Sequence, residues 1–474
     1  METRRSFITK ALAAATVPFL TRIEGQAAAM PPHIPLPEPV APAEGTITYT
    51  PDGIPAYYQE YMDQRVKDIH DLISFNSPWS DTFIFFTDTH VLSNHRMAGR
   101  LMGYLMQRTA VNKVFFGGDV CSAFGGKDDI DRAIQLQAES YYPFIRPYGP
   151  LYNIKGNHDF TINKDRSDAP SSWTYSSQSA RNIILGRSSI DHLVTNDDDP
   201  EACYYYVDNA LQHIRYIVVD SCDEATPGDV AWGVKYHFGR RQAEWLANKA
   251  ILTAPQGYAL VMLTHIPPVS ISRVENKDLC AFVTAAARRQ DVQLFGTTFS
   301  FTRCKANLLF VLSGHMHEDM QTYHNGLLHL ITSCDACYQD YRCSPFFQYS
   351  VIPPKTRGTI YEQTFDVVNI DREARRIDML RIGGGYDRHF HLDNHVLGIG
   401  ETITLHPSCL PQPHAWTSYN ALGSTEKEQR WTILNDIVSI DAGGTVRALR
   451  SGEATVFAED AHQHKEFFSI VVRF

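Results

Sequence analysis

Apolar and polar residues along this chain follow two different spacings. Short apolar runs bounded by Gly, Asp or Asn are typical of buried strands, and five such runs are each followed closely by Asp, Asn or His. The runs are Phe83–Phe86, Val114–Phe116, Leu151–Ile154, Leu260–Leu263 and Leu308–Leu312. Apolar residues recur instead at helical spacing over residues 57–75, 96–111 and 128–142. The alternation of the two spacings predicts a layered α/β fold.

The middle of the chain combines predicted strands with polar loops. Tyr204–Val207 and Tyr216–Ser221 are expected to form a strand pair, and Gln242–Leu246 lies on a helical pattern. Residues 163–179 and 196–200 are polar, which favours loops that would rim the ends of the strands. The three tyrosines of the first run would form a substrate platform or pack within the strand. Packing is favoured because β-strands are rich in Tyr.

Beyond Gly384 the pattern changes to short alternating runs separated by glycine turns. The runs are Thr402–Leu405, Trp431–Leu434, Val438–Ile440, Thr445–Leu449, Ala454–Phe457 and Phe467–Val472. Short strands at regular spacing are typical of a β-sandwich, so this region is predicted to be all-β. His462 and His464 lie near one of its turns and are expected to be solvated rather than metal-bound.

The first residues of the chain have the composition of a targeting segment. Basic residues, among them Arg4 and Arg5, precede the apolar run Ala11–Leu20, and Ala27–Ala29 offers a small-residue cleavage site. This pattern predicts a signal peptide over residues 1–29 and an exported protein, periplasmic or extracellular. The paired arginines resemble a twin-arginine signal, with an ordinary secretory signal as the alternative. Residues 30–45 are rich in proline and predict an extended linker.

Length and charge narrow the classes of protein. A chain of 474 residues with 43% hydrophobic residues is expected to form two globular domains with sizeable cores. Its net charge of −10 and pI near 6.0 argue against a stable nucleic-acid complex, because such proteins usually carry a basic surface. After the predicted signal peptide, no apolar stretch is long enough to span a membrane, so the mature chain is expected to have no membrane span.

Nine cysteines cannot all pair within one chain. Cys334, Cys337 and Cys343 form a cluster that lacks the second matching pair of a structural zinc site, so a local disulfide or simple packing is expected there. Cys121 lies two residues after Asp119. It is expected to pack near a functional site rather than act as a nucleophile.

Residues of the types that commonly bind metal ions follow the five apolar runs in a fixed order. They are Asp88-Thr89-His90, Gly118-Asp119, Gly156-Asn157-His158-Asp159, His265 and Gly314-His315-Met316-His317. Singly, each is more often a turn, a helix cap or a packed histidine, but together they predict one site, because open α/β sheets bind ligands where strands end. Carboxylate and imidazole donors suit Fe, Mn or Zn. Two such ions about 3.5–4 Å apart clamp a phosphate ester, and one carboxylate must then touch both.

This order resembles the calcineurin-like metallophosphoesterase superfamily. The superfamily's blocks DxH, GDxx, GNH[DE], a lone His and GHxH are present as DTH, GDVC, GNHD, LTHIPP and GHMH, and the resemblance covers about residues 80–390. It implies a layered β-sandwich of two mixed sheets with helices outside, over a domain placed at residues 46–391. It also implies two divalent or trivalent metal ions. The first ion would be held by Asp88, His90, Asp119 and His317, and the second by Asp119, Asn157, His265 and His315.

The resemblance further implies the roles of two residues that are not ligands. His158 would donate a hydrogen bond or a proton to the leaving oxygen, and Asp159 would hold that imidazole in orientation. The activity implied is hydrolysis of phosphate mono- or diesters, small or polymeric, by attack of a metal-bound hydroxide on phosphorus. The motifs separate neither the two ester types nor Fe, Mn and Zn. Asn94 and His95 would touch the substrate phosphate or serve only the local structure.

The C-terminal region, residues 394–474, resembles the bacterial immunoglobulin-like group 2 domain. The resemblance rests on a GE-T-TL pattern, a following Trp, and VSID-GG-VRAL-SGEATV. Such domains are commonly adhesive or spacer modules, which implies contact with a cell surface or a glycan; a lid packed on the catalytic domain is the alternative. A second hypothesis for the whole chain is therefore a surface-binding protein built on a phosphoesterase scaffold. The intact ligand set favours the enzyme.

Overall fold

The computed structural model describes residues 47–90, 95–120, 127–159, 181, 184–185, 192–223, 238–270, 273–274, 276–335, 355, 358–407, 430–460 and 464–474. The predicted signal peptide and linker lie outside these residues, as do Asn94, Cys121 and the whole polar stretch at 163–179. Among the described helices, none is long and apolar enough to cross a membrane.

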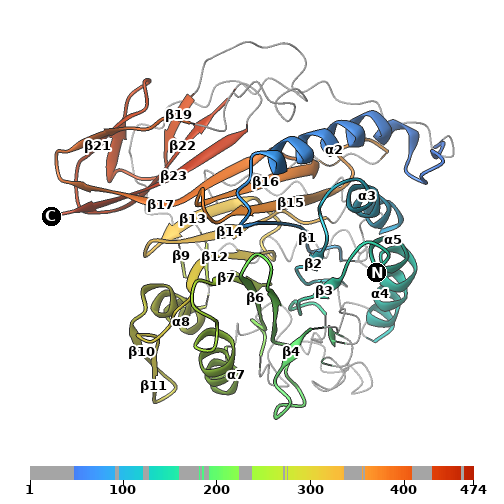
Figure 1. Ribbon diagram of the computed structural model, residues 1–474, viewed down its shortest axis with the longest axis horizontal. Helices are drawn as coiled ribbons and strands as arrows, with labels where there is room; N and C mark the ends of the chain where they lie inside the picture. Colours follow the sequence, from blue (N-terminus) through green and yellow to red (C-terminus); the bar gives the residue numbers. More distant parts are fainter. Residues whose placement is uncertain are drawn as a thin grey trace, which may run out of the picture. The chain divides into compact units, whose positions relative to one another are not determined.

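Two mixed β-sheets form the centre of the fold (Figure 1). The nine-stranded sheet consists, in spatial order, of β19 (Arg430–Ile433), β22 (Gly452–Glu459), β23 (Lys465–Arg473), β17 (Arg388–Gly398), β16 (Arg376–Gly383), β15 (Thr364–Asp371), β1 (Ser80–Phe86), β2 (Val114–Phe116) and β3 (Leu151–Asn153). The seven-stranded sheet consists of β13 (Met320–His324), β14 (Leu327–Ile331), β12 (Asn307–Ser313), β7 (Ala259–Thr264), β6 (Ile214–Val219), β5 (Tyr205–Asn209) and β4 (Val194–Thr195). Apolar residues of both sheets share one core, for example Phe83 and Val368 with Val261 and Leu312. The predicted layered sandwich is confirmed.

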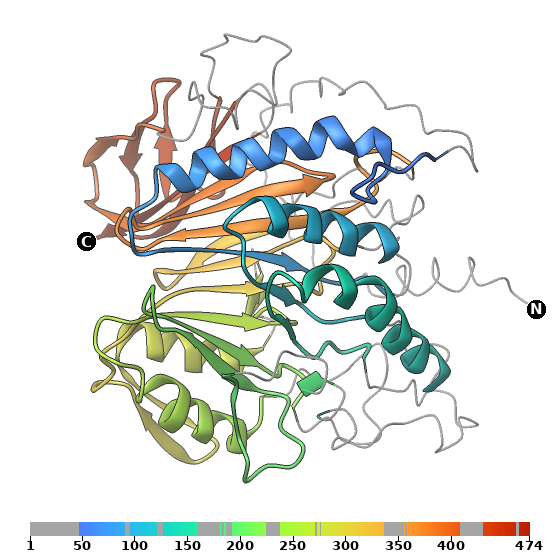
Figure 2. The same ribbon diagram turned by 45° about the vertical axis from the view of Figure 1, so that its right-hand side comes forward.

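Helices cover the two outer faces (Figure 2). The short helix η1 (Ala56–Tyr58), α2 (Gln59–Ser74), α3 (His95–Arg108), α4 (Lys127–Ser140) and α5 (Tyr142–Ile145) lie on the nine-stranded sheet. The seven-stranded sheet is covered by α7 (Arg240–Trp245), the π-helix η3 (Leu246–Ile251) and α8 (Lys277–Arg288). Leu101 of α3, for example, packs with Ile84 of β1. The predicted helices are confirmed to within a few residues at their ends.

Parallel pairing brings the motif loops to one edge of the molecule. β1 pairs in parallel with β2, and β2 with β3, so Ile84, Val114 and Leu151 lie side by side. In the other sheet, β7 pairs in parallel with both β6 and β12. Since the carboxyl ends of parallel strands lie at the same edge of a sheet, the five motif loops meet there.

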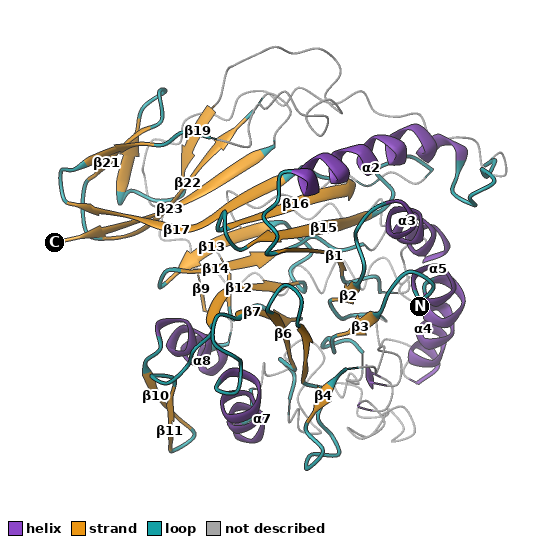
Figure 3. Ribbon diagram, in the orientation of Figure 1, coloured by secondary structure: helices purple, strands orange, loops and turns teal. Residues whose placement is uncertain are grey.

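Beyond β15 the described chain contains only strands and connecting loops (Figure 3). A three-stranded sheet of β18 (Thr402–Thr404), β21 (Thr445–Ala448) and β20 (Val438–Ile440) packs on β22 and β23 around its own apolar core, which includes Val446 and Ile470. The all-β prediction is confirmed. The predicted domain boundary near residues 391–394 falls inside β17, which pairs with β16 on one side and β23 on the other. The immunoglobulin-like group 2 identity stays a prediction.

Two small hairpins complete the fold, β8 (Val269–Ser270) with β9 (Arg273–Val274) and β10 (Asp291–Leu294) with β11 (Thr297–Ser300). The predicted packing of the tyrosines is confirmed for Tyr204 and Tyr205, which are fully buried. The Tyr204 hydroxyl donates to Asp199 at 2.9 Å, and the Tyr205 hydroxyl donates to a backbone carbonyl of β3 at 2.7 Å.

Two sequence-based expectations about side chains have different outcomes. His464 is not solvated as predicted, because its Nδ1 accepts from the Asp387 backbone N–H at 3.2 Å and the side chain is only 12% exposed. His462 lies outside the described residues. Cys334 is buried, and the choice between a local disulfide and simple packing stays a prediction. Cys337 and Cys343 are not among the described residues.

Acid should destabilise the fold through two buried carboxylates. Burial alone would raise the pKa of Asp366, but Arg381 and Arg388 hold it below its usual range, and Arg65 does the same for Asp387. A carboxylate with a lowered folded-state pKa stabilises the fold above its unfolded pKa of about 3.9, and that stabilisation is lost as the pH falls through the lower folded value. We expect the urea midpoint to fall steeply below about pH 4.

Asp387→Asn tests this account. It should lower the free energy of unfolding at pH 7 by about 3 kcal/mol, because Arg65 loses a buried partner, and should make the acid decline shallower. Asp393→Asn, which alters an exposed pair with Arg375, is the control and should change neither quantity much. An Asp387→Asn variant with wild-type stability at pH 7 would contradict the assignment.

Candidate metal centre

Loops that follow five strands carry the predicted ligands. Asp88 and His90 follow β1, Asp119 follows β2, and Asn157 follows β3. His265 follows β7 in the other sheet, and the pair His315 and His317 follows β12. Six of the seven form two groups in which the ligand atoms lie within 4.8 Å of one another. The seventh, Asn157, lies 3.0 Å from His265 through its Oδ1 atom, so the structure brings the whole predicted set together.

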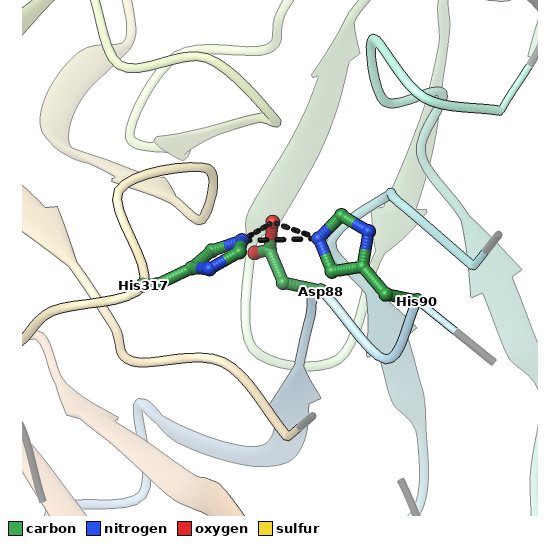
Figure 4. Close-up of side chains that lie close together, drawn as sticks. All are labelled: Asp88, His90 and His317. Carbon is green, nitrogen blue, oxygen red and sulfur yellow. Dashed lines mark hydrogen bonds and ion pairs between the residues drawn. The ribbon is translucent and has the colours of Figure 1, made fainter. Parts of the chain in front are cut away.

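The first group consists of Asp88, His90 and His317 (Figure 4). The three side chains point toward one another from two loops. The Nε2 atoms of His90 and His317 lie 3.0 Å apart, and the Asp88 Oδ1 atom lies 3.2 Å from the Nε2 of His317 and 3.7 Å from that of His90. Two ring nitrogens and a carboxylate oxygen thus converge on one point.

The second group consists of Asp119, His265 and His315. The His265 Nε2 atom lies 3.1 Å from the Asp119 Oδ2 atom, and the rings of His265 and His315 meet edge to face with centroids 5.2 Å apart. Asn157 adds its amide oxygen on the same side of His265. Nitrogen and oxygen donors again converge.

The two groups adjoin, and Asp119 lies between them. Its Oδ2 atom is 3.1 Å from His265 of the second group and 3.7 Å from His90 of the first. From the other side, Asp88 Oδ1 lies 3.9 Å from His265. One oxygen of Asp119 and one of Asp88 therefore each face histidine nitrogens of both groups.

In both Asp88 and Asp119, one carboxylate oxygen accepts hydrogen bonds that fix the side chain, and the other oxygen faces the histidine ligands. Asp88 Oδ2 accepts from the Thr87 hydroxyl at 2.6 Å and from the His315 backbone N–H at 2.9 Å, which leaves Oδ1 toward the histidines. Asp119 Oδ1 accepts from the His158 backbone N–H at 2.7 Å, which leaves Oδ2 toward the centre. His265 is oriented in the same way, since its Nδ1 lies 2.8 Å from the Gly117 carbonyl and its Nε2 is directed at the ligands.

Backbone strain concentrates at the ligands. Asp88, His90, Asp119, His315 and His317 all have φ between 48° and 71°, a region that L-residues rarely adopt. Such conformations persist only where the surroundings hold them, and they cluster at functional sites. Here the backbone N–H of Asp88 donates to the Gly118 carbonyl at 2.9 Å and that of His90 to the Asp119 carbonyl at 3.0 Å. Six other non-glycine residues of the described chain have similar φ values, among them Asn325 and Arg375 in hairpin turns, so the strain accompanies the ligand loops but does not by itself identify a site.

The motif glycines permit close contact between neighbouring loops. A Cβ atom on Gly314 would lie 2.5 Å from the Asp88 carboxylate, and one on Gly156 would lie 2.1 Å from that of Asp119. Gly118 has φ +98°, and a Cβ there would meet His265 at 2.7 Å. Each glycine therefore allows its own loop to lie close to a ligand that belongs to a neighbouring loop.

The electrostatics of the centre favour a cation. Burial alone would raise the pKa of Asp88, but His265 and His317 hold it well below its usual range. Burial alone would lower the pKa of His265, but Asp119 and Asp88 raise it to about 10. Burial and the neighbouring His265 lower the pKa of His315 to about 3. The two ionised carboxylates thus hold His265 in its cationic form, so the centre favours positive charge of the kind that a bound metal ion would supply.

His158 and Asp159 lie beside the ligands. The His158 ring meets the His90 ring edge to face, with centroids 5.1 Å apart, and is partly exposed while most ligands are buried. Asp159 accepts from the backbone N–H groups of Asp119 at 3.0 Å, Val120 at 2.7 Å and Gly156 at 2.7 Å. It fixes two motif loops, a role that the sequence did not suggest. Its predicted role in orienting the His158 ring stays a prediction, as does contact of His95 with substrate.

Other supporting residues were missed by the sequence. Lys155 donates to Asp220 at 2.6 Å, and the Ser221 hydroxyl accepts from the Ile266 backbone N–H at 3.0 Å. Asp220 and Ser221 directly follow β6. The partner of Asp220, Lys155, is two residues from Asn157, and the partner of Ser221, Ile266, is next to His265. Their position in the sequence could have identified them, because polar residues that follow a strand next to the motif strands are candidates for supporting the ligand loops.

Comparison with known proteins agrees with this geometry. A family model described as calcineurin-like phosphoesterase matches residues 82–319, just over half of the chain. Similar solved structures include a dimetal phosphatase from Danio rerio (14% identity, TM-score 0.39, covering 65% of this chain and 98% of that one). Two others are GAP50, the anchor in the inner membrane complex of Plasmodium (11%, 0.37, 63% and 83%), and the phosphopantetheinyl hydrolase of Mycobacterium tuberculosis (12%, 0.27, 54% and 91%). No curated protein matches the chain. The family match shows that this chain belongs to the calcineurin-like phosphoesterase family.

Proposed function

We propose that this protein hydrolyses phosphate monoesters or diesters with two metal ions held side by side. The observation that carries the proposal is the position of Asp119, whose Oδ2 atom lies within 3.7 Å of ligand nitrogens from both groups. A carboxylate shared between two ions is what two-metal ester hydrolysis requires. Asp88, His90 and His317 would hold one ion; Asn157, His265 and His315 would hold the other.

The donor set fits such ions and leaves their identity open. Carboxylate, amide and imidazole atoms, without a described thiol in either group, suit Fe, Mn or Zn. When bound, the two ions would polarise the phosphate and supply an activated water for attack on phosphorus. The protein contributes fixed ligand positions, through the hydrogen bonds of Asp88, Asp119 and His265 to neighbouring loops.

In this proposal His158 would act on the leaving group. Its backbone N–H is fixed by Asp119 at 2.7 Å, and its ring lies against His90 at the exposed side of the buried ligands. An imidazole there can donate a proton to the departing oxygen, a step that commonly contributes about 10²–10⁴-fold to the rate.

The His158→Ala variant should reveal this role through the leaving group. We expect kcat/KM to fall by about 10²–10⁴-fold for an alkyl phosphate ester, whose leaving oxygen needs a proton. The loss should be much smaller for the corresponding p-nitrophenyl ester, whose leaving group departs as an anion. His70→Ala, at an exposed histidine of α2 on the outer face of the nine-stranded sheet, is the control. Equal losses on both esters would contradict proton donation by His158.

The proposed activity is tested with paired chromogenic monoester and diester substrates. The full chain is stripped of metal, then reloaded separately with Mn, Zn or Fe, and turnover is measured on each ester. Restored turnover with a preference for one ester would support the proposal and identify the bond type. The absence of turnover on either ester, with two ions bound per chain, would count against it.

We also propose export, on the basis of the N-terminal sequence pattern alone. Residues 1–29 combine basic residues, a short apolar run and small residues at a cleavage position. Mass spectrometry of the protein recovered from the producing cells should show a mature N-terminus near residue 30. An intact Met1 in protein that stays inside the cells would contradict it.

A further inference from the structure

A buried cluster of four charged side chains lies next to the His317 loop. Asp319, Asp366, Arg381 and Arg388 are each no more than 4% exposed. Asp319 lies two residues after His317, while the other three belong to β15, β16 and β17. The matched family region ends at residue 319, so three of the four lie beyond it. A buried charge cluster costs free energy unless its members pair well, and these contacts are well formed.

Three groups contact a single oxygen of Asp319. Its Oδ1 atom accepts hydrogen bonds from the Ser333 backbone N–H at 2.9 Å and from Arg381 Nη2 at 2.7 Å, and it forms an ion pair with Arg388 Nη1 at 2.9 Å. The Ser333 hydroxyl in turn donates to the His317 carbonyl at 3.1 Å. The segment from His317 to Asp319 is therefore fixed at both of its ends.

The two arginines connect this loop to the nine-stranded sheet. Arg381 Nε lies 2.9 Å from Asp366 Oδ1, and Arg388 Nη2 lies 2.8 Å from Asp366 Oδ2. Two carboxylates and two guanidinium groups balance in charge, and each arginine joins both carboxylates. Neutralising Asp319 would leave two buried cations facing one anion and would release the loop.

Such fixation is needed because His317 has a strained backbone. Its φ of 59° lies in a region that L-residues rarely adopt. We infer that Asp319 is a positioning residue for the metal ligand His317, held by Arg381 and Arg388 of the C-terminal strands. The inference rests on the proposed two-metal centre. It gives β16 and β17 a direct part in that centre, beyond the region that defines the family.

The test is equilibrium dialysis of the full, metal-free chain against Mn²⁺, with the bound ions counted over a range of concentrations. Wild type should bind two ions per chain. In Asp319→Asn, one of the two ions should bind about 10–100-fold more weakly, as is common when a group that orients a ligand is lost. Ser333→Ala, which removes only the hydrogen bond to the His317 carbonyl, should weaken the same ion by a smaller factor.

Lys113→Met is the matched control. It removes a buried ion pair of similar quality, Lys113 Nζ to Asp81 Oδ1 at 2.7 Å, at the opposite end of β1 and β2 from the ligands. Both ions should bind to this variant as to wild type. Dialysis at a temperature where all variants are folded separates ligand positioning from lost stability.

Two results would overturn the inference. One is wild-type binding of both ions by folded Asp319→Asn, and the other is equal weakening in Lys113→Met. If Asp319→Asn does not fold, Ser333→Ala decides, since wild-type binding there would also overturn it. Wild-type protein that binds fewer than two ions would instead contradict the proposed function, because the measurement involves no ester.

Discussion

Replacing Asp119 with Asn should abolish ester hydrolysis, with a fall in kcat/KM of more than about 100-fold. Groups that merely orient a metal ligand commonly cost roughly 10–100-fold when lost, and the Asp119 Oδ2 atom lies within 3.7 Å of ligand nitrogens from both groups. An amide keeps the shape and the bond from the His158 backbone N–H but lacks the charge that attracts two cations. The measurement is turnover of the preferred ester with saturating metal.

A buried carboxylate elsewhere provides the control for Asp119→Asn. Asp371 at the end of β15 accepts from the Ser77 backbone N–H at 2.9 Å and from that of Ala374 at 3.0 Å, much as Asp119 accepts from His158. Asp371→Asn should lower stability and leave turnover per folded molecule unchanged. Wild-type turnover by Asp119→Asn would contradict the two-metal account. Under the alternative hypothesis of a surface-binding protein, Asp119→Asn would leave binding to the surface unchanged.

Adding one methyl group at Gly156 should have the second largest effect. The Cβ of Gly156→Ala would lie 2.1 Å from Asp119 Oδ1 and 2.3 Å from Asp119 N, so the carboxylate must move. A displacement of about 1 Å at a reacting centre can cost about 100-fold in rate, and the crowding should also cost roughly 1–3 kcal/mol of stability. We expect hydrolysis to fall by about 100-fold, with weaker binding of Mn²⁺ measured by dialysis.

Gly443→Ala is the matched control for this substitution. A Cβ on Gly443 meets only the Asp441 side chain, at an ordinary 3.4 Å, in the turn between β20 and β21. This variant should hydrolyse esters and bind metal as wild type does. If Gly156→Ala behaved in the same way, the close contact between the β2 and β3 loops would not matter for the site.

The fold and the ligands could be predicted because both are encoded locally. Each ligand follows directly on an apolar strand, so the motif and its placement at a strand end can be recognised within about ten residues of sequence, and parallel pairing then brings the loops together. Strands such as Phe83–Phe86 and Leu308–Leu312 were recognisable because both of their faces are buried between sheet and helices.

The supporting contacts could not be predicted because their partners are distant in sequence. Asp319 meets Arg381 and Arg388 only when β16 and β17 lie beside the ligand loop, and nothing local in sequence marks either arginine. Asp159 looked like a partner for the histidine before it, yet three backbone N–H groups reach it from two loops. His464 was expected to be solvated because it lies near a predicted turn, whereas the fold places it against Asp387.

The sequence patterns also did not predict that the nine-stranded sheet continues into the C-terminal region. The change of spacing beyond Gly384 suggested a separate domain, but β17 belongs to both regions and pairs in parallel with β23, about 75 residues later. Parallel pairing of distant strands leaves no signal in the alternation of apolar and polar residues, which reports only the faces of each strand.

The most direct test of the account is electron paramagnetic resonance of the metal-free chain titrated with Mn²⁺. If Asp119 joins two ions, the protein should bind two Mn²⁺ per chain, and their spectrum should show magnetic coupling that disappears in Asp119→Asn. A single bound ion, or two ions with the spectrum of isolated Mn²⁺, would contradict the shared carboxylate on which the proposed function rests.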